Sequence, residues 1–319
     1  MKPFNVFPYD SNINFMRMRW VSLTIAALIM FVGLGAMVTK GFNFALDFTG
    51  GVGVELRFQK AADVDGIRSR PEKAGYANAQ VQTFGTGSDV LVRLQDRPHG
   101  ASQAGGTSSS IAQEVRTLAS TPDNQAEVRS SAQISPQVGK ELAQNGLYAL
   151  LFVLFGFGVY ISARFEWKFA AAAIVTTLHD VIVVAGWFAL SGHEFDLTVL
   201  AGVLSVMGYS INDTIVVFDR VRENFRGMRA PPYEVLNKSV NQTLSRTVIT
   251  SFVAFLTVFA LYAYGGGSLR GMAESQMIGI VIGTLSSIFV ACPLLLWFGV
   301  SKQDLMPKAR DEAALARRP

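Results

Sequence analysis

The feature that most constrains this chain is a series of six apolar stretches, each long enough for one helix to cross a lipid bilayer. A spanning helix needs about 20 consecutive, mainly apolar residues. Half of the 319 residues are hydrophobic and only 16% are charged, which argues against an ordinary soluble protein. We therefore predict a polytopic α-helical membrane protein with six transmembrane helices, at residues 20–39, 142–163, 168–190, 197–219, 246–264 and 272–298.

The first apolar stretch follows a polar segment, residues 1–19, and no small-residue cleavage pattern comes after it. A secretory signal peptide carries such a pattern. We interpret this stretch as a retained membrane anchor.

Basic residues predict the orientation of these helices. The formal net charge is +4, and by the positive-inside rule the basic segments mark the cytoplasmic side. Both termini, residues 1–19 and 301–319, are then cytoplasmic, and residues 40–141 form an external region. We expect membrane lipid, and no nucleic acid, as the partner of the excess charge. The basic residues are Arg17, Arg19, Arg164, Lys168, Arg220, Arg222, Arg226, Arg229, Lys238, Lys302, Lys308, Arg310, Arg317 and Arg318.

The external region shows strand-like alternation and two helical segments, in the order strand, helix, strand, strand, helix, strand. This order is typical of a ferredoxin-like α+β domain. Residues 101–110 are rich in small side chains, and we expect them to be a flexible insertion. His99 is the only histidine of the region and Cys292 the only cysteine of the chain, so neither a metal site nor a disulfide is predicted.

The connection between the fourth and fifth spans, residues 220–245, contains apolar residues at helical spacing after a Pro231–Pro232 start signal. Two interpretations remain open. The segment is either an amphipathic helix that lies on the membrane surface and runs into the fifth span, or an ordinary connector packed on its neighbours.

Asp213 lies inside the fourth apolar stretch. An aspartate at the centre of a transmembrane helix costs roughly 2.5–3.5 kcal/mol, so an ionisable group there is a functional hypothesis by default. A polar face of this kind can line a narrow hydrated path, or it can hydrogen-bond across a tight helix interface. The polar residues around Asp213 are Gly202, Ser205, Tyr209, Ser210, Asn212 and Thr214.

Arg246 opens the fifth span and comes within reach of Asp213 if the two helices are adjacent and antiparallel. A guanidinium stays charged, so it cannot release a proton itself. An aspartate that exchanges its proton for an arginine partner is a two-state element that couples proton passage to movement. The alternatives are a structural ion pair, or an arginine that reaches to the lipid headgroups.

His179 and Asp180 stand near the middle of the third span. Adjacent residues point about 100° apart around a helix, so the two need not face one partner. Either residue could extend a proton relay, or both could tie helices together. On the sixth span, Gly279 and Gly283 form a small-residue pair that indicates close helix packing.

Several of these segments together resemble the SecF proteins of the SecD/SecF family, bacterial protein-export membrane proteins of the RND-like superfamily. The matching sequence segments are LDFTGG at 46–51, RFEWKFAAAAI at 164–174 with LHD at 178–180, GYSINDTIVVFDR at 208–220 and NQTLSRT at 241–247. The resemblance covers nearly the whole chain.

The resemblance implies a non-enzymatic subunit of the cell inner membrane. With SecD, such a subunit uses the proton motive force to help preproteins leave the SecYEG channel, and it has no cofactor. The unfolded preprotein would be met on the external side. Asp213 then matches the proton-responsive carboxylate and Arg246 its partner. The LDFTGG motif, with Asp47, Thr49, Gly50 and Gly51, would be structural and would connect the first helix to the external domain.

Three alternatives remain open. Asp180 and Asp213 could be an intramembrane aspartyl protease pair, but they lie at different depths and the Gly-x-Gly-Asp text of such proteases is missing. The chain could belong to an RND-type exporter of lipids or small molecules. Sodium could replace the proton, because oxygen atoms around a carboxylate suit either ion.

Overall fold

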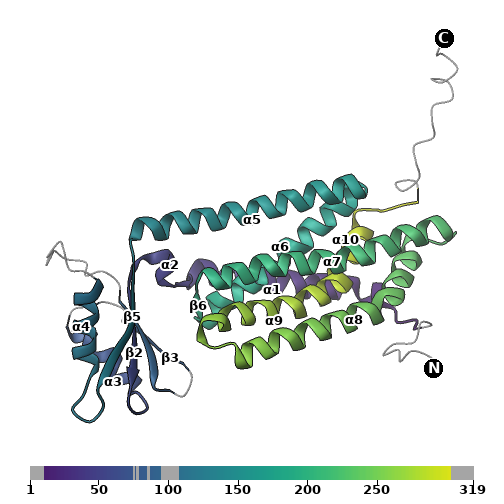
Figure 1. The fold of residues 1–319 in the computed structure, drawn as a ribbon. Coiled ribbons are helices and arrows are strands. Elements are labelled where there is room, and N and C mark those ends of the chain that lie inside the picture. Colours follow the sequence, from purple (N-terminus) through teal and green to yellow (C-terminus); the bar gives the residue numbers. More distant parts are fainter. Residues whose placement is uncertain (1–10, 75, 77–78, 85–86, 95–107, 303–319) are drawn as a thin grey trace.

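The computed structural model describes residues 11–74, 76, 79–84, 87–94 and 108–302, which form a long bundle of helices with a small α/β domain at one end (Figure 1). The chain enters through the 3-10 turn Phe15–Met18 and helix α1 (Arg19–Thr39), builds the α/β domain, and returns through the remaining helices. His99, residues 101–107 of the expected insertion and residues 303–319 of the tail lie outside the described residues.

Six helices of the bundle are long and apolar enough to cross a membrane. The second of them, α5, begins earlier than the predicted residue 142, because Ser135 caps its first turn and Pro136 follows. The elements are α1, α5 (Pro136–Arg164), α6 (Trp167–Ser191), α7 (Leu197–Gly227), α8 (Pro232–Tyr264), and α9 (Gly267–Ser286) continued by α10 (Cys292–Trp297).

The connection 220–245 is not a separate element. Helix α7 continues to Gly227, and α8 begins at Pro232 and runs without a break through the fifth span. Residues from Pro232 onward thus form a helix that runs into the fifth span, and its place on the membrane surface stays a prediction. Its apolar face is buried against the other helices, as the packed-connector alternative required. The residues that make this contact are Val235, Leu236, Val240 and Leu244.

The last span contains one π-helical turn, Ser287–Ala291, between α9 and α10. Pro293 is the second residue after this turn and has no N–H group to donate. A proline inside a helix also clashes with the carbonyl four residues earlier, and a wider turn relieves both problems. Such turns occur often at functional sites, and this one follows directly after Ser286.

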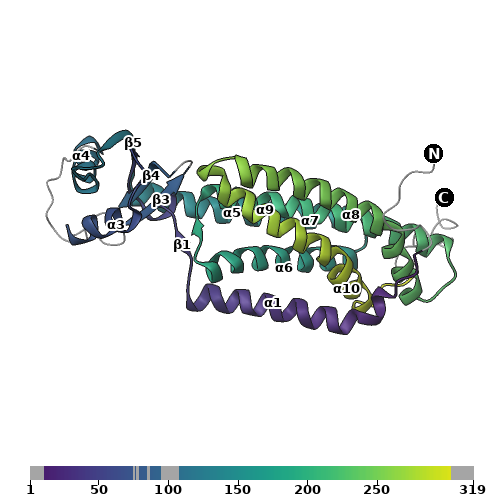
Figure 2. The same ribbon diagram turned by 90° about the horizontal axis from the view of Figure 1, so that it is seen from below.

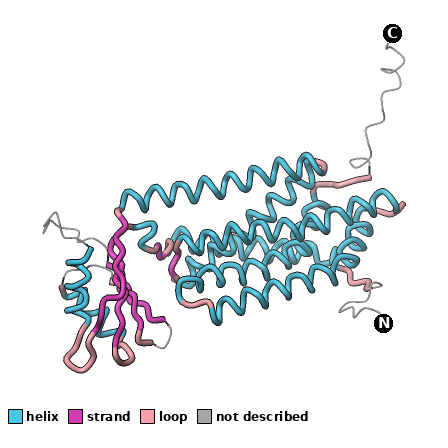
Figure 3. Tube along the Cα trace, in the orientation of Figure 1, coloured by secondary structure: helices cyan, strands magenta, loops and turns pink. Residues whose placement is uncertain are grey.

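The α/β domain contains a four-stranded antiparallel sheet in the order β3-β4-β2-β5. The two central strands carry a buried apolar row, Val52, Val54 and Leu56 on β2 with Val90 and Val92 on β4, which packs against α3 and α4. The elements in chain order are β2 (Gly51–Phe58), α3 (Val64–Lys73), β3 (Gln80–Phe84), β4 (Asp89–Leu94), α4 (Ser108–Ala119) and β5 (Ala126–Ile134). Figure 3 shows these strands at one end of the helical bundle, running across its long axis.

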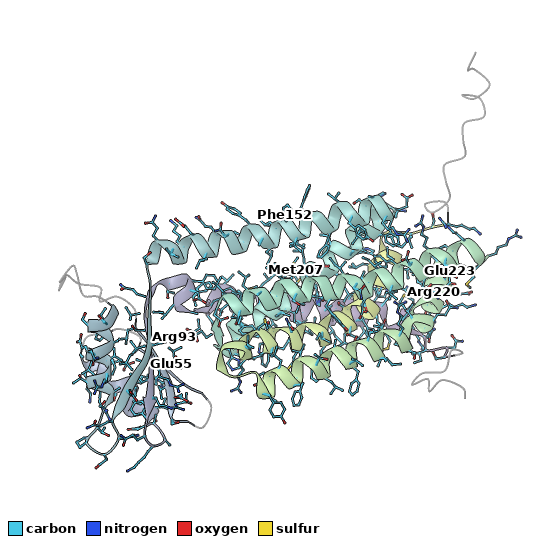
Figure 4. The ribbon with its side chains drawn as sticks, in the orientation of Figure 1. Glu55, Arg93, Phe152, Met207, Arg220 and Glu223 are labelled. Carbon is cyan, nitrogen blue, oxygen red and sulfur yellow. The ribbon has the colours of Figure 1, made fainter. Side chains whose placement is uncertain are left out.

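Glycines allow the closest helix contacts. Helix α1 lies beside α6 (Figure 2), and a Cβ on Gly186 would come within 2.5 Å of the Gly33 Cα. Gly279 and Gly283 on α9 face Val206 and Ser210 on α7 in the same way. Helix α5 runs along the outside of the bundle, and its Phe152 points away from it (Figure 4).

Candidate functional site

Asp213 is buried in the bundle, with 3% of its surface exposed, where α7, α8 and α9 meet. The Ser251 hydroxyl on α8 lies 3.4 Å from Asp213 Oδ2. Tyr209 on α7 and Thr284 on α9 each donate to the Ser251 oxygen at 2.7 Å. Three hydroxyl side chains, one from each of these helices, therefore form a cluster beside this carboxylate.

Arg246 does not form an ion pair with Asp213 in the part of the chain that the structure describes. Its side chain is exposed on α8, although its charge lies near enough to act on Asp213 electrostatically. The two helices are adjacent, as the prediction required. In this structure the Asp213 carboxylate and the Arg246 guanidinium are therefore close but do not contact each other.

Asn212 was expected on the face of α7 that carries Asp213, and this prediction is wrong. Its side chain is exposed, because one residue turns the helix by about 100°. The side chain of Ser205, two turns earlier, is exposed as well. Ser210 and Thr214 are buried with Asp213.

Asp180 is fully buried and forms the centre of a second cluster. Its Oδ2 accepts hydrogen bonds from Ser210 on α7 at 2.5 Å and from Ser286 on α9 at 2.7 Å. Its Oδ1 lies 2.9 Å from His179 Nδ1, so the side chains of these two adjacent residues contact each other. The other nitrogen of His179, Nε2, is buried with no hydrogen-bond partner among the described residues.

The two carboxylates differ in their donors. Asp180 has three close polar partners among the described residues. Asp213 has one long contact. Ser210 belongs to the Asp180 cluster and lies one turn before Asp213 on the same helix, so the clusters share helix α7.

Ser251, Thr284 and Ser286 were missed by sequence reasoning. Each is a hydroxyl in a mainly apolar helix, where such groups can bond to their own backbone. Ser251 and Thr284 do this as well, to the carbonyls of Thr247 and Ile280. The signal that could have found them is the Gly279–Gly283 pair, which marks the face of α9 that touches α7.

The LDFTGG motif lies between the bundle and the sheet. Residues Leu46–Thr49 form the short helix α2, and Gly50 and Gly51 adopt φ values of 72° and 134°, which favour glycine. Thr49 Oγ1 donates to the carbonyl of Ala45, the residue just before the motif. Asp47 reaches out of it and accepts a hydrogen bond from the backbone N–H of Leu197 at 3.2 Å.

Two family models match the chain. The model described as "Protein export membrane protein SecD/SecF, C-terminal" matches residues 114–301, and the model described as "SecD/SecF GG Motif" matches residues 35–62. The chain belongs to the SecD/SecF family.

Relatives in this family are similar over nearly the whole of this chain. The "Protein translocase subunit SecF" of Pseudomonas aeruginosa is 42% identical over 303 residues, which cover 94% of this chain and 96% of that protein. The "Protein translocase subunit SecDF" of Brucella abortus is 35% identical over 97% of this chain but only 40% of its own length. This chain therefore corresponds to less than half of a SecDF protein.

A solved structure agrees with these sequence matches. The crystal structure of SecDF from Thermus thermophilus, described as a translocon-associated membrane protein, matches with a TM-score of 0.79 and 35% identity. The match covers 92% of this chain and 40% of that one. The helical bundle of this chain therefore has the fold of the SecD/SecF family, which is that of a polytopic helical membrane protein.

Proposed function

We propose that this chain is an accessory subunit of the Sec protein-export machinery that couples the proton motive force, together with SecD, to late translocation and release of preproteins. The names of its SecF and SecDF relatives support the export role. The observation that supports the proton role is Asp213, a buried carboxylate with one distant hydroxyl donor in a membrane-spanning helix.

The chain is a multi-pass protein of the inner membrane, and we propose that both termini are cytoplasmic. Figure 4 places Arg220 and Glu223 at the end of α7 far from the α/β domain, where the basic segments gather. The positive-inside rule then makes the α/β domain external. We propose a ferredoxin-like domain, which the element order and the sheet order β3-β4-β2-β5 support.

The proposed coupling is an exchange at Asp213. A charge moved through the membrane potential is worth about 2.3 kcal/mol per 100 mV, enough to bias a conformational change. When Asp213 is ionised, Arg246 is the nearby positive charge that can compensate it. When Asp213 is protonated, its own O–H can donate into the cluster and Arg246 is free to move away.

We propose that the hydroxyl groups around Asp213 pass the proton over short hydrogen-bond distances. Tyr209 on α7 and Thr284 on α9 both donate to the Ser251 hydroxyl on α8, and Ser251 in turn lies 3.4 Å from Asp213. The His179–Asp180 pair would extend this relay through Ser210. Thr214 and Asn212 border the path on α7, with Asn212 on the exposed side. The energy source is the ion gradient, with no resident cofactor.

SecD is the first partner we propose, because SecDF relatives carry the equivalent of this chain in a longer protein. The other partners that we propose are the SecYEG translocon, an unfolded preprotein and the surrounding lipid. The family is one of translocase subunits rather than enzymes. A protease pair would share one proton between its carboxylates, but the described contacts of Asp180 and Asp213 are to different partners.

The experiment is an Asp213→Asn variant in membrane vesicles with the complete Sec machinery. We expect normal membrane insertion and loss of the export that an imposed proton gradient stimulates. The matched control is Asp219→Asn, on the same helix, whose exposed side chain pairs with Arg164 at 3.2 Å. Full gradient-stimulated export by Asp213→Asn would overturn the proposal, and stimulation by a sodium gradient alone would identify sodium as the coupling ion.

A further inference from the structure

The segment Asn43–Asp47 is attached to the first turn of helix α7. Strand β1 (Asn43–Phe44) pairs in parallel with β6 (Glu194–Phe195), which directly precedes α7. The Ala45 N–H continues this pairing to the Phe195 carbonyl at 2.9 Å. Asp47 Oδ2 then accepts from the Leu197 N–H, the first amide of α7.

That hydrogen bond has a specific chemical role. The first four N–H groups of a helix have no partner inside the helix. Asp196 caps α7 by accepting from the Val199 N–H at 2.7 Å, but it does not reach Leu197. Asp47 completes the cap from a distant part of the chain, and its negative charge lies at the positive end of the helix dipole.

The same segment is also fixed to the α/β domain and to α5. Gly51 begins β2 and pairs with Ile134 at the end of β5. At the start of α5, Gly139 packs on the carbonyl of Phe48, where a Cβ would come within 2.7 Å of the oxygen. The motif thus joins the sheet, the start of α5 and the start of α7.

A second contact joins the sheet to the segment that directly precedes helix α7. Arg93 on β4 forms an ion pair with Glu194 on β6, two residues before Asp196. Burial lowers the pKa of Arg93 from its ordinary value, and the charges of Asp196 and Asp47 oppose this shift. Arg93 and Glu55 lie on the side of the sheet that faces the bundle (Figure 4), across a cavity of about 820 Å³.

Helix α7 can carry movement between these contacts and Asp213. It is one continuous helix from Leu197 to Gly227. At 1.5 Å per residue, Leu197 lies on the order of 24 Å from Asp213 along the axis. A rotation or shift of α7 at Asp213 therefore reaches the Leu197 amide and, through Asp47, the sheet.

We propose that Asp47 is a positioning residue that couples helix α7 to the external domain, with the Arg93–Glu194 ion pair as a second, releasable contact. This inference rests on the proposed function, because it assumes that α7 moves when Asp213 exchanges its proton. It gives the LDFTGG motif a mechanical role, in which domain position follows the state of α7.

The test measures the distance between the domain and the bundle in the complex with SecD, in vesicles with an imposed proton gradient. Spin labels are placed on cysteines introduced at Arg68 on α3 and at Tyr264, which is 90% exposed at the end of α8. The native Cys292 is buried, so labelling is confined to the introduced sites.

We expect the gradient to shift this distance in the otherwise unsubstituted chain and most of the shift to be lost in Asp47→Ala. Asp47→Asn keeps a carbonyl acceptor for the Leu197 N–H and should keep the shift. The matched control is Asp63→Ala, because Asp63 caps α3 within the domain by accepting from the Gly66 N–H at 3.2 Å. It should keep the full shift, although it loses a helix cap of the same kind.

A shift in Asp47→Ala as large as that in the unsubstituted chain would overturn the coupling role and leave the proposed function intact. A shift that persists in Asp213→Asn would instead count against the proposed function. For the second contact, Arg93→Glu and Glu194→Arg should each broaden the distances and together restore them. No restoration in the double variant would remove the ion pair from the coupling.

Discussion

Ser251 on α8 holds its hydroxyl oxygen 3.4 Å from Oδ2 of Asp213 on α7, at the long limit of a hydrogen bond. The same oxygen lies 2.7 Å from the Thr247 carbonyl. A hydroxyl has one proton, so Ser251 cannot donate fully to both acceptors. The orientation of this one hydroxyl decides whether Asp213 has a donor.

Ser251→Ala should reduce gradient-stimulated export about fivefold, the effect of losing a hydrogen bond worth about 1 kcal/mol. The stability of the bundle should change by less than about 1 kcal/mol, because hydrogen bonds between membrane helices average about 0.6 kcal/mol. Export in vesicles and thermal unfolding in detergent measure the two effects. Thr250→Ala is the control, since the hydrogen bonds of Thr250 within the described part of the chain go to carbonyls of its own helix. Equal export by both variants would contradict the role of Ser251.

Asp180→Ala should lower the free energy of unfolding by roughly 2–4 kcal/mol. The substitution removes the acceptor for Ser210, Ser286 and His179, and an unsatisfied buried donor costs about 1–3 kcal/mol. Asp180→Asn keeps one carbonyl oxygen and should cost less. Thermal unfolding of the purified protein measures the series, with the exposed Asp219→Ala as the control, at less than about 1 kcal/mol. A loss in Asp180→Ala no larger than the control would show that the three donors find other partners.

The spans and the place of Asp213 could be predicted from the sequence because both depend on local composition. A run of apolar residues has to be buried or in lipid, and one carboxylate inside it is conspicuous. The order of strands and helices between the first two spans also follows from local alternation. Boundaries were less accurate where helices extend beyond the apolar run, as α5 does at Pro136 and α7 at Gly227.

The partners of Asp213 could not be predicted, since they depend on how three helices rotate about their axes. Asn212 is next to Asp213 in sequence and faces the other way, whereas Ser251 and Thr284 come from distant turns. The separation of Arg246 from Asp213 is equally a matter of side-chain placement. The hydrogen bond from Leu197 to Asp47 joins residues 150 positions apart, and no periodicity within either segment indicates it.

Gly186→Val should separate helices α1 and α6. A Cβ at Gly186 would lie 2.5 Å from the Gly33 Cα, and a backbone atom cannot rotate away as a side chain can. Overpacking of this kind costs about 1–3 kcal/mol or more. The measurement is thermal unfolding in detergent. Gly208→Val on α7 is the control, because among the described residues no atom outside its own stretch of helix lies within 4 Å of its added Cβ. Equal unfolding temperatures for the two variants would rule out the close α1–α6 contact.

Asn241→Ala should loosen the N-terminal segment from helix α8. The Asn241 side chain bonds to Ile13 twice, as acceptor from its N–H at 2.9 Å and as donor to its carbonyl at 2.8 Å. Loss of both bonds should raise hydrogen exchange at the Ile13 amide about tenfold, since each is worth about 0.5–1.5 kcal/mol. The segment should stay docked, because Phe15 and Met16 remain buried in the bundle. Exchange measured by mass spectrometry tests this, with the exposed Asn145→Ala on α5 as the control. Unchanged protection at Ile13 would mean that the buried Phe15 and Met16 alone hold the segment, and that the asparagine bonds contribute nothing to it.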